Sequence, residues 1–489
     1  MSLAYYGYPF LAAYPSFPYI ALSLLLIFTV IISVLRALHF PPGERPQNFH
    51  ILGILVIAAA VGFTLGIASR RSANDTVHTG IPMDRVIALS GILREDPRSL
   101  QSGSGLGILE IRECIAHDGL RASSKGRVSV FFPAESIPRL KEFGRGSELY
   151  IDGTLSSGSR GIVFNARSVH VVKAAPAAET LRTGLRVTLL EKFQNRNDAK
   201  YTGSAAPVWG SLASALLLGI RDNLDIDLLD AFMKSGCSHI LALSGMHLAI
   251  ISGVLSFIIR RPLGIRGASL AGAVFITAYV FIAGSQPSLV RSAIMYLIGA
   301  LAIWGFLKTR ALSLLSMALI IQLIVQSETG ISLSFILSYL ALAGMLTLGE
   351  TLRGLFRGRL PELVNGSLSA SLGAFVFTAP VVVFYFGSLK PVGIIAGLII
   401  APLSSVFMVL SLGALAAAFL PLPLWSFFDL LLTGLYRVME FTVSLAGRVP
   451  GFSFSNPVPV LVVSGLIWLA VLLIKKQDDL RRSSVANLD

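Results

Sequence analysis

The sequence is poor in charged residues and in cysteine. Only 14% of its 489 residues are Asp, Glu, Lys or Arg, whereas a soluble globular protein typically carries about 25%. Hydrophobic residues make up 54% of the chain and the mean hydropathy is +0.73, which predicts a polytopic membrane protein. Two cysteines, Cys114 and Cys237, exclude a disulfide scaffold and a zinc cluster. We expect the two to be buried separately rather than bonded to each other.

The sequence also lacks the signatures of catalysis and of nucleotide binding. It contains no Gly-x-x-x-x-Gly-Lys-Ser/Thr loop, no Ser-His-Asp constellation and no paired carboxylates, and no histidine follows His247. We therefore expect no enzyme activity, no metal site and no cofactor, and any driving force would come from outside the chain. The net charge of +13 suits anionic lipid or nucleic acid, or merely cytoplasmic loops enriched in Lys and Arg.

Long apolar runs define the predicted membrane part, since a helix spans a bilayer with about twenty apolar residues. Two runs, near 18–38 and 50–68, give two expected N-terminal spans in residues 1–69, and further runs fill residues 238–474. The run at 391–420 is too long for one straight span, so we expect either a tilted helix or a re-entrant pair and about ten to twelve spans in all. The later runs lie near 238–259, 267–284, 287–307, 311–327, 331–349, 367–388, 391–420, 424–446 and 457–474.

The charges of the short loops predict the orientation. Groups of Lys and Arg lie at 260–266, 308–310, 353–359 and 475–482, and counting spans puts all four on one side. The positive-inside rule makes that side cytoplasmic, together with the tail at 475–489. The polar residues 70–205 are then extracytoplasmic.

Residues 70–205 read as a small β domain. Apolar and polar residues alternate over five short runs, which predicts five strands. Five strands in so short a stretch fit an OB-type barrel, a fold often used for oligonucleotides, although composition alone allows any small barrel. The runs are 85–93, 106–114, 127–132, 148–153 and 161–172.

Basic and aromatic residues are interleaved in this domain, as in surfaces that bind single strands by stacking and charge. The candidate DNA-guiding residues are Arg127, Phe131, Phe132, Lys141 and Arg145. Because nearby glutamates dilute the charge, an ordinary solvated face is the alternative. The next stretch, 206–237, reads as an amphipathic interfacial segment with Asp225 as a helix cap. Its carboxylates would repel phosphate.

A polar stretch opens the third predicted span. Residues 235–247 read Ser-Gly-Cys-Ser-His-Ile-Leu-Ala-Leu-Ser-Gly-Met-His. We expect one helix from here to about Ile259, in which His239 and His247 lie about 80° apart and share a broad face. Polar groups at membrane depth usually face a bundle interior or a watery cavity. The pair therefore either lines a path or hydrogen-bonds to neighbouring helices.

A second polar stretch, Gly-Ser-Gln-Pro-Ser-Leu-Val-Arg, covers residues 284–291. Pro287 suits the first turn of a helix, which puts Arg291 about one turn inside the membrane. A guanidinium there is costly unless it snorkels, pairs or faces water. Because arginine binds phosphate through two donors, Arg291 either belongs to a path for a phosphate-bearing substrate or snorkels to the headgroups.

These stretches resemble the signature of the ComEC family, whose competence domain forms the DNA-import channel of naturally transformable bacteria. The usual form is close to Ala-Gly-Leu-Ala-His-Leu-Leu-Ala-Ile-Ser-Gly-Leu-His. The resemblance covers residues 235–420 well and the outer domain loosely. The family's Gln-Leu-Ser-Phe segment has Ser332 in place of Gln, which puts that amide's role in doubt. The matching residues are Gly236, His239, Leu241, Ala242, Ser244, Gly245, His247, Pro287, Ser288, Arg291, Met295, Leu333, Ser334 and Phe335.

The resemblance implies a channel in the bacterial inner membrane that imports single-stranded DNA during natural transformation, with an OB-like outer domain. Many ComEC proteins end in a metallo-β-lactamase-like domain with a His-x-His-x-Asp-His motif, and we expect a form without it. The implied partners are a DNA receptor, a cytoplasmic DNA translocase, single-strand-binding proteins and a separate nuclease. The expected path residues are Ser238, His239, Ser244, Gly245, His247, Gln286, Ser288, Arg291 and Ser334.

Two other classes of function remain open at this point. The first is a diverged transporter of another anionic solute or lipid. The second is a binding module on the outer surface that the helices merely anchor, although the numerous polar groups within the membrane argue against it.

Overall fold

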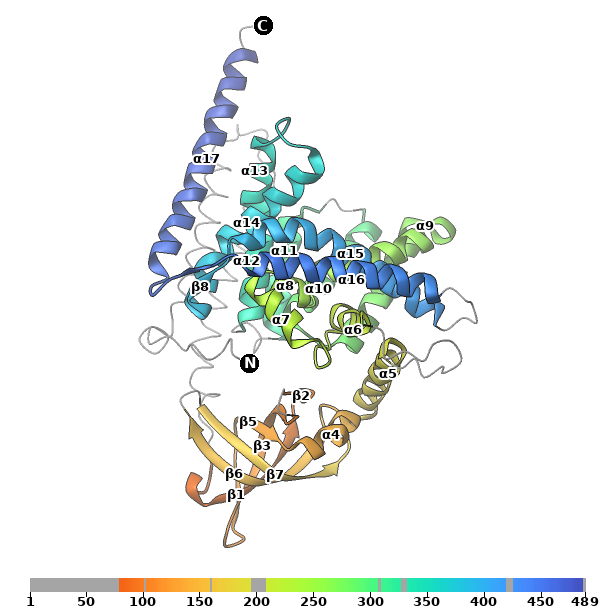
Figure 1. Ribbon diagram of the computed structural model, residues 1–489, viewed down its shortest axis with the longest axis vertical. Helices are drawn as coiled ribbons and strands as arrows, with labels where there is room; N and C mark the ends of the chain where they lie inside the picture. Colours follow the sequence, from red (N-terminus) through yellow and green to blue (C-terminus); the bar gives the residue numbers. More distant parts are fainter. Residues whose placement is uncertain are drawn as a thin grey trace.

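The computed structural model describes residues 79–100, 103–158, 161–194, 208–306, 309–326, 332–418 and 425–486. A sheet domain formed by the first part of this range lies below a bundle of helices (Figure 1). The two expected N-terminal spans, in residues 1–69, lie outside the described residues.

The strands of the sheet domain follow the predicted alternation. In Val86–Leu93 and Arg127–Phe132 the more buried residues alternate with more exposed ones along most of the strand, as expected for a sheet with one covered face. All five predicted strands are present, and two short ones accompany them. The elements are β1 (Val86–Leu93), β2 (Arg98–Ser99), β3 (Gly105–Ala116), β4 (Arg121–Ser123), β5 (Arg127–Phe132), α4 (Ile137–Phe143), β6 (Glu148–Gly158) and β7 (Gly161–Lys173).

The pairing order of the sheet is β1-β6-β7-β5-β3-β2, with β4 beside β3, and β1 also pairs with β3. All pairs are antiparallel except β5 with β7, which run parallel. Gly91 and Gly153 lie at register shifts where a Cβ would collide with the backbone of the facing strand. Glycine bulges of this kind bend a strand sharply. The apolar core of the domain includes Leu89, Leu109 and Phe164.

Helix α5 (Ala177–Gln194) follows β7 and lies between the sheet domain and the bundle (Figure 1). The bundle holds the remaining helices and a two-stranded sheet of β8 (Ser388–Leu389) and β9 (Phe452–Ser453). Its helices are α6 (Gly210–Leu218), α7 (Ile226–Lys234), α8 (Ser238–Leu241), α9 (Gly245–Ala283), α10 (Pro287–Trp304), α11 (Ala311–Val325), α12 (Leu333–Gly344), α13 (Glu350–Leu355), α14 (Glu362–Phe386), α15 (Val392–Ala417), α16 (Trp425–Gly447) and α17 (Val458–Ala486).

The bundle has the character of a multi-pass membrane protein. Within the described ranges, six helices are long and apolar enough to cross a membrane, and the apolar helices Ala311–Val325 and Val458–Ile474 are shorter. Large apolar side chains such as Phe257 and Leu363 remain 85% exposed on outward faces, which suits contact with lipid. The ambiguous run at 391–420 contains a single helix, α15, which continues past Pro402.

The third and fourth predicted spans both lie in α9, which consists of two helices joined at a kink, where Gly264 near Pro262 has a non-helical backbone. One expectation about this part of the chain is wrong. The segment 206–237 is not amphipathic throughout, because α6 is buried on nearly all sides in the bundle core. Only α7 is amphipathic, and the Asp225 side chain caps it by accepting from the Asp227 N–H at 2.9 Å.

Helices α12 and α14 cross at glycines. A Cβ on Gly373 would lie 2.5 Å from the Gly344 oxygen and 2.7 Å from the Gly349 nitrogen. Small residues let membrane helices approach this closely. At the same place α12 passes into α13 through a π-helical turn, Met345–Gly349.

Candidate functional site

The signature at residues 235–247 does not form one helix. The short helix α8 ends at Leu241, and Ala242 is extended, with φ −78° and ψ 133°. Ser244 is also extended, with φ −126° and ψ 172°, and acts as the N-cap of α9. The predicted continuous helix is therefore wrong, and the 80° relation between its two histidines does not apply.

Side chains from distant segments satisfy the backbone at this break. Arg221, in the loop between α6 and α7, donates from Nη2 to the Leu241 carbonyl at 2.8 Å. Ser288, in the first turn of α10, donates to the Leu243 carbonyl at 2.5 Å. Irregular backbone at membrane depth is tolerated only where protein or a watery cavity surrounds it. The break is thus part of a built polar site.

His247 lies one turn into α9 and is fully buried. Its Nδ1 accepts a hydrogen bond from the Ser244 backbone N–H at 3.1 Å, and the Ser244 hydroxyl lies 2.8 Å away. A neutral imidazole that accepts at Nδ1 carries its proton on Nε2. Among the described residues this buried Nε2 has no hydrogen-bond partner, so His247 presents an unused donor.

Arg291 is a buried cation in α10, and only 7% of the residue is exposed. One Nη donates to the Ser338 carbonyl of α12, and the other lies 3.4 Å from the Ser292 hydroxyl. The guanidinium carbon is 5.8 Å from the centre of the Tyr339 ring. No carboxylate within the described ranges forms an ion pair with Arg291, and its Nε has no partner there. Snorkelling is excluded for this conformation, because the side chain points into the bundle.

Gly245 brings the two sequence motifs together. A Cβ at this position would lie 2.5 Å from the Ser292 hydroxyl and 3.1 Å from an Arg291 nitrogen. The absence of a side chain at Gly245 is therefore what lets the guanidinium approach the first turn of α9. We call Ser244, Gly245, His247, Ser288 and Arg291 the polar cluster.

Sequence reasoning missed two residues that support the cluster. Gln322 of α11 is fully buried and donates to the Pro287 carbonyl at 3.0 Å, where α10 begins. Tyr339 of α12 donates to the Gln322 side-chain oxygen at 2.9 Å. A glutamine within an apolar run carries a desolvation cost unless it is bonded, and that signal could have identified Gln322.

Four other predicted path residues lie apart from these contacts. Ser238 and His239 are exposed and bond locally, to the Phe232 carbonyl at 3.3 Å and to the Gly236 carbonyl at 3.3 Å. Ser334 is exposed near the start of α12. Gln286 is the N-cap residue of α10 and its amide lies beside the loop that follows α6.

The candidate DNA-guiding residues of the sheet domain differ in availability. Phe132 is 1% exposed in the domain core and so cannot stack on a base, which corrects that part of the prediction. Lys141 pairs with Asp222 of the bundle at 2.6 Å, and Arg145 pairs with Glu179 at 2.7 Å. Arg127 is exposed and Phe131 is half-buried on the same strand, β5.

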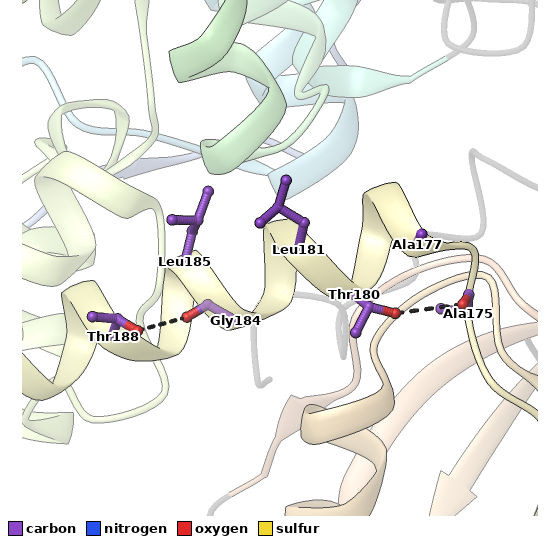
Figure 2. A pocket seen from close by; sticks show the side chains of 7 residues that line it. All are labelled: Ala175, Ala177, Thr180, Leu181, Gly184, Leu185 and Thr188. Atoms are coloured by element: carbon purple, nitrogen blue, oxygen red, sulfur yellow. Dashed lines mark hydrogen bonds between the residues drawn. The ribbon is translucent and has the colours of Figure 1, made fainter.

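A groove of about 660 Å³ runs along α5 and is mainly apolar. Figure 2 shows the side chains of Leu181 and Leu185 projecting from this face, while Thr180 and Thr188 bond back to backbone oxygens. The groove holds no charged residue. Within the described ranges, no three His, Cys, Asp or Glu side chains are grouped to hold a metal.

The break in the signature and the buried Arg291 both lie within the part of the chain that has known relatives. The sequence profile of the family described as competence protein matches residues 216–478, more than half of the chain. The chain is 28% identical over 275 residues to the ComE operon protein 3 of Bacillus subtilis (strain 168), a match that covers 52% of this chain and 34% of that protein.

A second relative, an uncharacterized protein of Aquifex aeolicus (strain VF5), is 23% identical over 352 residues, which cover 71% of this chain and 78% of that protein. The Bacillus match spans only about a third of that relative's length. The profile match includes the whole polar cluster. The chain therefore belongs to the competence protein family, as its resemblance to ComEC proteins predicts.

Proposed function

We propose that this chain forms a channel in the bacterial inner membrane that imports single-stranded DNA during natural transformation. The observation that carries the proposal is Arg291. A buried cation without a carboxylate partner in the described part of the chain is costly, and such residues inside membranes mark substrate paths. A DNA strand brings one phosphate per nucleotide, and each phosphate would otherwise bear the cost of entering an apolar region.

The geometry of the polar cluster suits a phosphate. Arg291 offers a guanidinium, and His247 offers a second donor in Nε2–H. The first turns of α9 and α10 carry the cluster, and the backbone amides of a helix N-terminus favour negative charge. The cluster is closed in this conformation, because Arg291 donates to the Ser338 carbonyl. We infer that a strand passing the site replaces that carbonyl as the acceptor.

We propose that the sheet domain is an OB-like barrel that guides the strand from the extracytoplasmic side. Supporting features are the return pairing of β1 with β3, the parallel pair β5–β7 and a helix, α4, between β5 and β6. Arg127 and Phe131 lie on the same strand, β5, and are the residues that we propose for this role, because Arg127 is exposed and Phe131 is only half-buried. Stacking on one aromatic ring beside a cation is the usual means of holding a single strand.

The chain would act as a conduit and not as an enzyme, so the translocase that pulls the strand and any nuclease would be other proteins. Four groups of Lys and Arg support the proposal that one side of the bundle faces the cytoplasm. They lie at 260–266, 308–310, 353–359 and 475–482. A DNA receptor would deliver the strand to the opposite side.

The test is uptake of labelled DNA in a deletion strain that expresses the variants at matched abundance. Arg291→Ala should abolish uptake, and Arg291→Lys should retain part of it, because charge survives without the two-donor fork. Arg310→Ala is the control, since Arg310 is exposed at the start of α11. Full uptake by Arg291→Ala would remove the cluster from the path.

The same deletion strain distinguishes DNA import from the alternative function, transport of another anionic solute or lipid. If the deletion leaves DNA uptake intact but abolishes flux of another phosphate-bearing solute or lipid into vesicles, the chain is a transporter of that compound. The buried guanidinium would then recognise its phosphate by the same chemistry.

A further inference from the structure

A first chain of contacts joins the sheet domain to the start of α10. Asp96, in the loop after β1, accepts from Arg182 of α5 at 2.7 Å on each carboxylate oxygen and lies 3.5 Å from Arg186. Arg186 in turn lies 3.3 Å from the Ala283 carbonyl at the end of α9, to which it donates. Only three residues separate Ala283 from Pro287, where the helix that carries Ser288 and Arg291 begins.

The packing of α5 supports this first link. Arg182 is 1% exposed, so its guanidinium is fixed between Asp96 and Glu179. Burial raises the pKa of the Asp96 carboxyl, but hydrogen bonding and charge from Arg182, with the charge of Arg186, outweigh it and hold the pKa below its usual value. Arg182 and Arg186 are four residues apart and so lie on one face of α5. This face carries both contacts of the first link.

A second chain of contacts reaches the other side of the polar cluster. Lys141 of α4 forms an ion pair with Asp222 of the bundle at 2.6 Å. The adjacent residue, Arg221, donates to the Leu241 carbonyl at the helix break. Three residues later the cluster begins at Ser244. The first link thus ends at Ala283, shortly before α10 begins, and the second ends at Leu241, shortly before α9 begins. The first turns of these two helices meet at Gly245.

We propose that the sheet domain holds the polar cluster closed through these two links, and that Lys141, Asp222 and Arg186 are positioning residues. A shift of the sheet domain would pull on Asp222 and Ala283 together, and so would separate the first turn of α9 from α10. The consequence of this coupling for DNA entry rests on the proposed function, whereas the coupling itself does not. It assigns Lys141 to the link and not to DNA.

The experiment measures the cluster directly, without DNA. Ser292→Cys, in a full-length chain with Cys114→Ser and Cys237→Ala, places a thiol beside the Arg291 guanidinium. Its reaction rate with N-ethylmaleimide in native membranes reports opening of the cluster. Lys141→Asp and Asp222→Lys should each raise the rate about threefold, the population shift expected for loss of a half-buried ion pair.

The double variant Lys141→Asp/Asp222→Lys restores an ion pair with reversed charges and should return the rate to that of the parent. Lys125→Asp, an exposed lysine between β4 and β5, is the control and should change nothing. Unchanged rates in both single variants, or a double variant that stays reactive, would overturn the coupling.

Uptake measured in parallel separates this inference from the proposed function. Restored uptake in the double variant supports the link. A double variant that is labelled at the parent's rate but imports no DNA would still support the coupling, and would overturn the statement that Lys141 does not act on DNA. If even the parent protein imports no DNA, the channel function fails while the labelling rates still decide the coupling.

Discussion

Replacement of Arg291 by methionine should preserve or raise the stability of the protein while abolishing DNA uptake. Arg291 is 7% exposed, and its guanidinium contacts the Ser338 carbonyl, the Ser292 hydroxyl at 3.4 Å and the Tyr339 ring. Methionine has a similar length and fills irregular apolar space well. The substitution therefore separates what the charge does for folding from what it does for function.

The expected size follows from two opposing terms. Loss of a hydrogen bond from a charged group costs about 1.5–3 kcal/mol. Burial of an ion costs several kcal/mol even after relaxation, and replacing buried ionic groups by apolar ones is often neutral or stabilising by about 1–4 kcal/mol. The Ser338 carbonyl belongs to α12 and keeps its place in the helix. We therefore expect the free energy of unfolding to change between zero and a gain of about 4 kcal/mol.

The assay is thermal unfolding of the detergent-solubilised protein, followed by tryptophan fluorescence, beside uptake in cells. Ser338→Ala is a useful control, because it leaves the backbone acceptor in place and should alter neither measurement. A methionine variant that unfolds well below the parent, yet still imports DNA, would show that Arg291 is a structural residue and would refute the reasoning.

Three further predictions concern packing, orientation and pH. Gly373→Ala should lower the unfolding midpoint, because its Cβ would lie 2.5 Å from a backbone oxygen of α12, whereas Gly366→Ala, with nothing within 4 Å, should raise it slightly. A His117→Cys variant with Cys114→Ser should react with an impermeant maleimide in intact spheroplasts, and a reaction that needs permeabilised membranes would reverse the orientation. The pKa of Asp96 is lowered in the folded state. The carboxylate therefore stabilises the protein fully at pH values above its ordinary pKa, and this stabilisation is lost as the pH falls through the lowered pKa. Asp96→Asn should flatten the dependence of the unfolding midpoint on pH below about 4.

The choice of cysteine in the labelling experiment itself depends on the structure. Cys114 lies in β3, between β1 and β4, and is fully buried, and burial raises the pKa of its thiol. A thiol that is both buried and protonated reacts slowly on either side of a membrane. His117, in the exposed turn after β3, has no such protection.

Local patterns were enough to predict the strands and several helix ends. Alternation over Val86–Leu93 and Arg127–Phe132 reflects one buried face, and a pattern of that kind is read directly from sequence. Pro287 begins a helix because its fixed φ and missing N–H suit that position. Membrane-length apolar runs likewise follow from composition alone.

The break at Ala242 could not be predicted, because its cause lies elsewhere in the chain. Leucine and alanine around it favour a helix. The extended backbone is stabilised there by the hydrogen bonds that Arg221 and Ser288 donate to its carbonyls. The ion pair of Lys141 could not be predicted for the same reason, since its partner Asp222 is 81 residues away. Both features depend on tertiary contacts and not on local preference.

The helix break has a consequence for the order in which this protein is assembled. The Leu243 carbonyl receives its donor from Ser288, which is synthesised 45 residues later. Until α10 is in the membrane, that carbonyl has no such partner, so a nascent chain ending before α10 gains by continuing α8 into α9 as one helix. The extended conformation at 242–244 is then acquired only when the second half of the signature arrives. Biogenesis, and not the local sequence, would set the final shape of the segment.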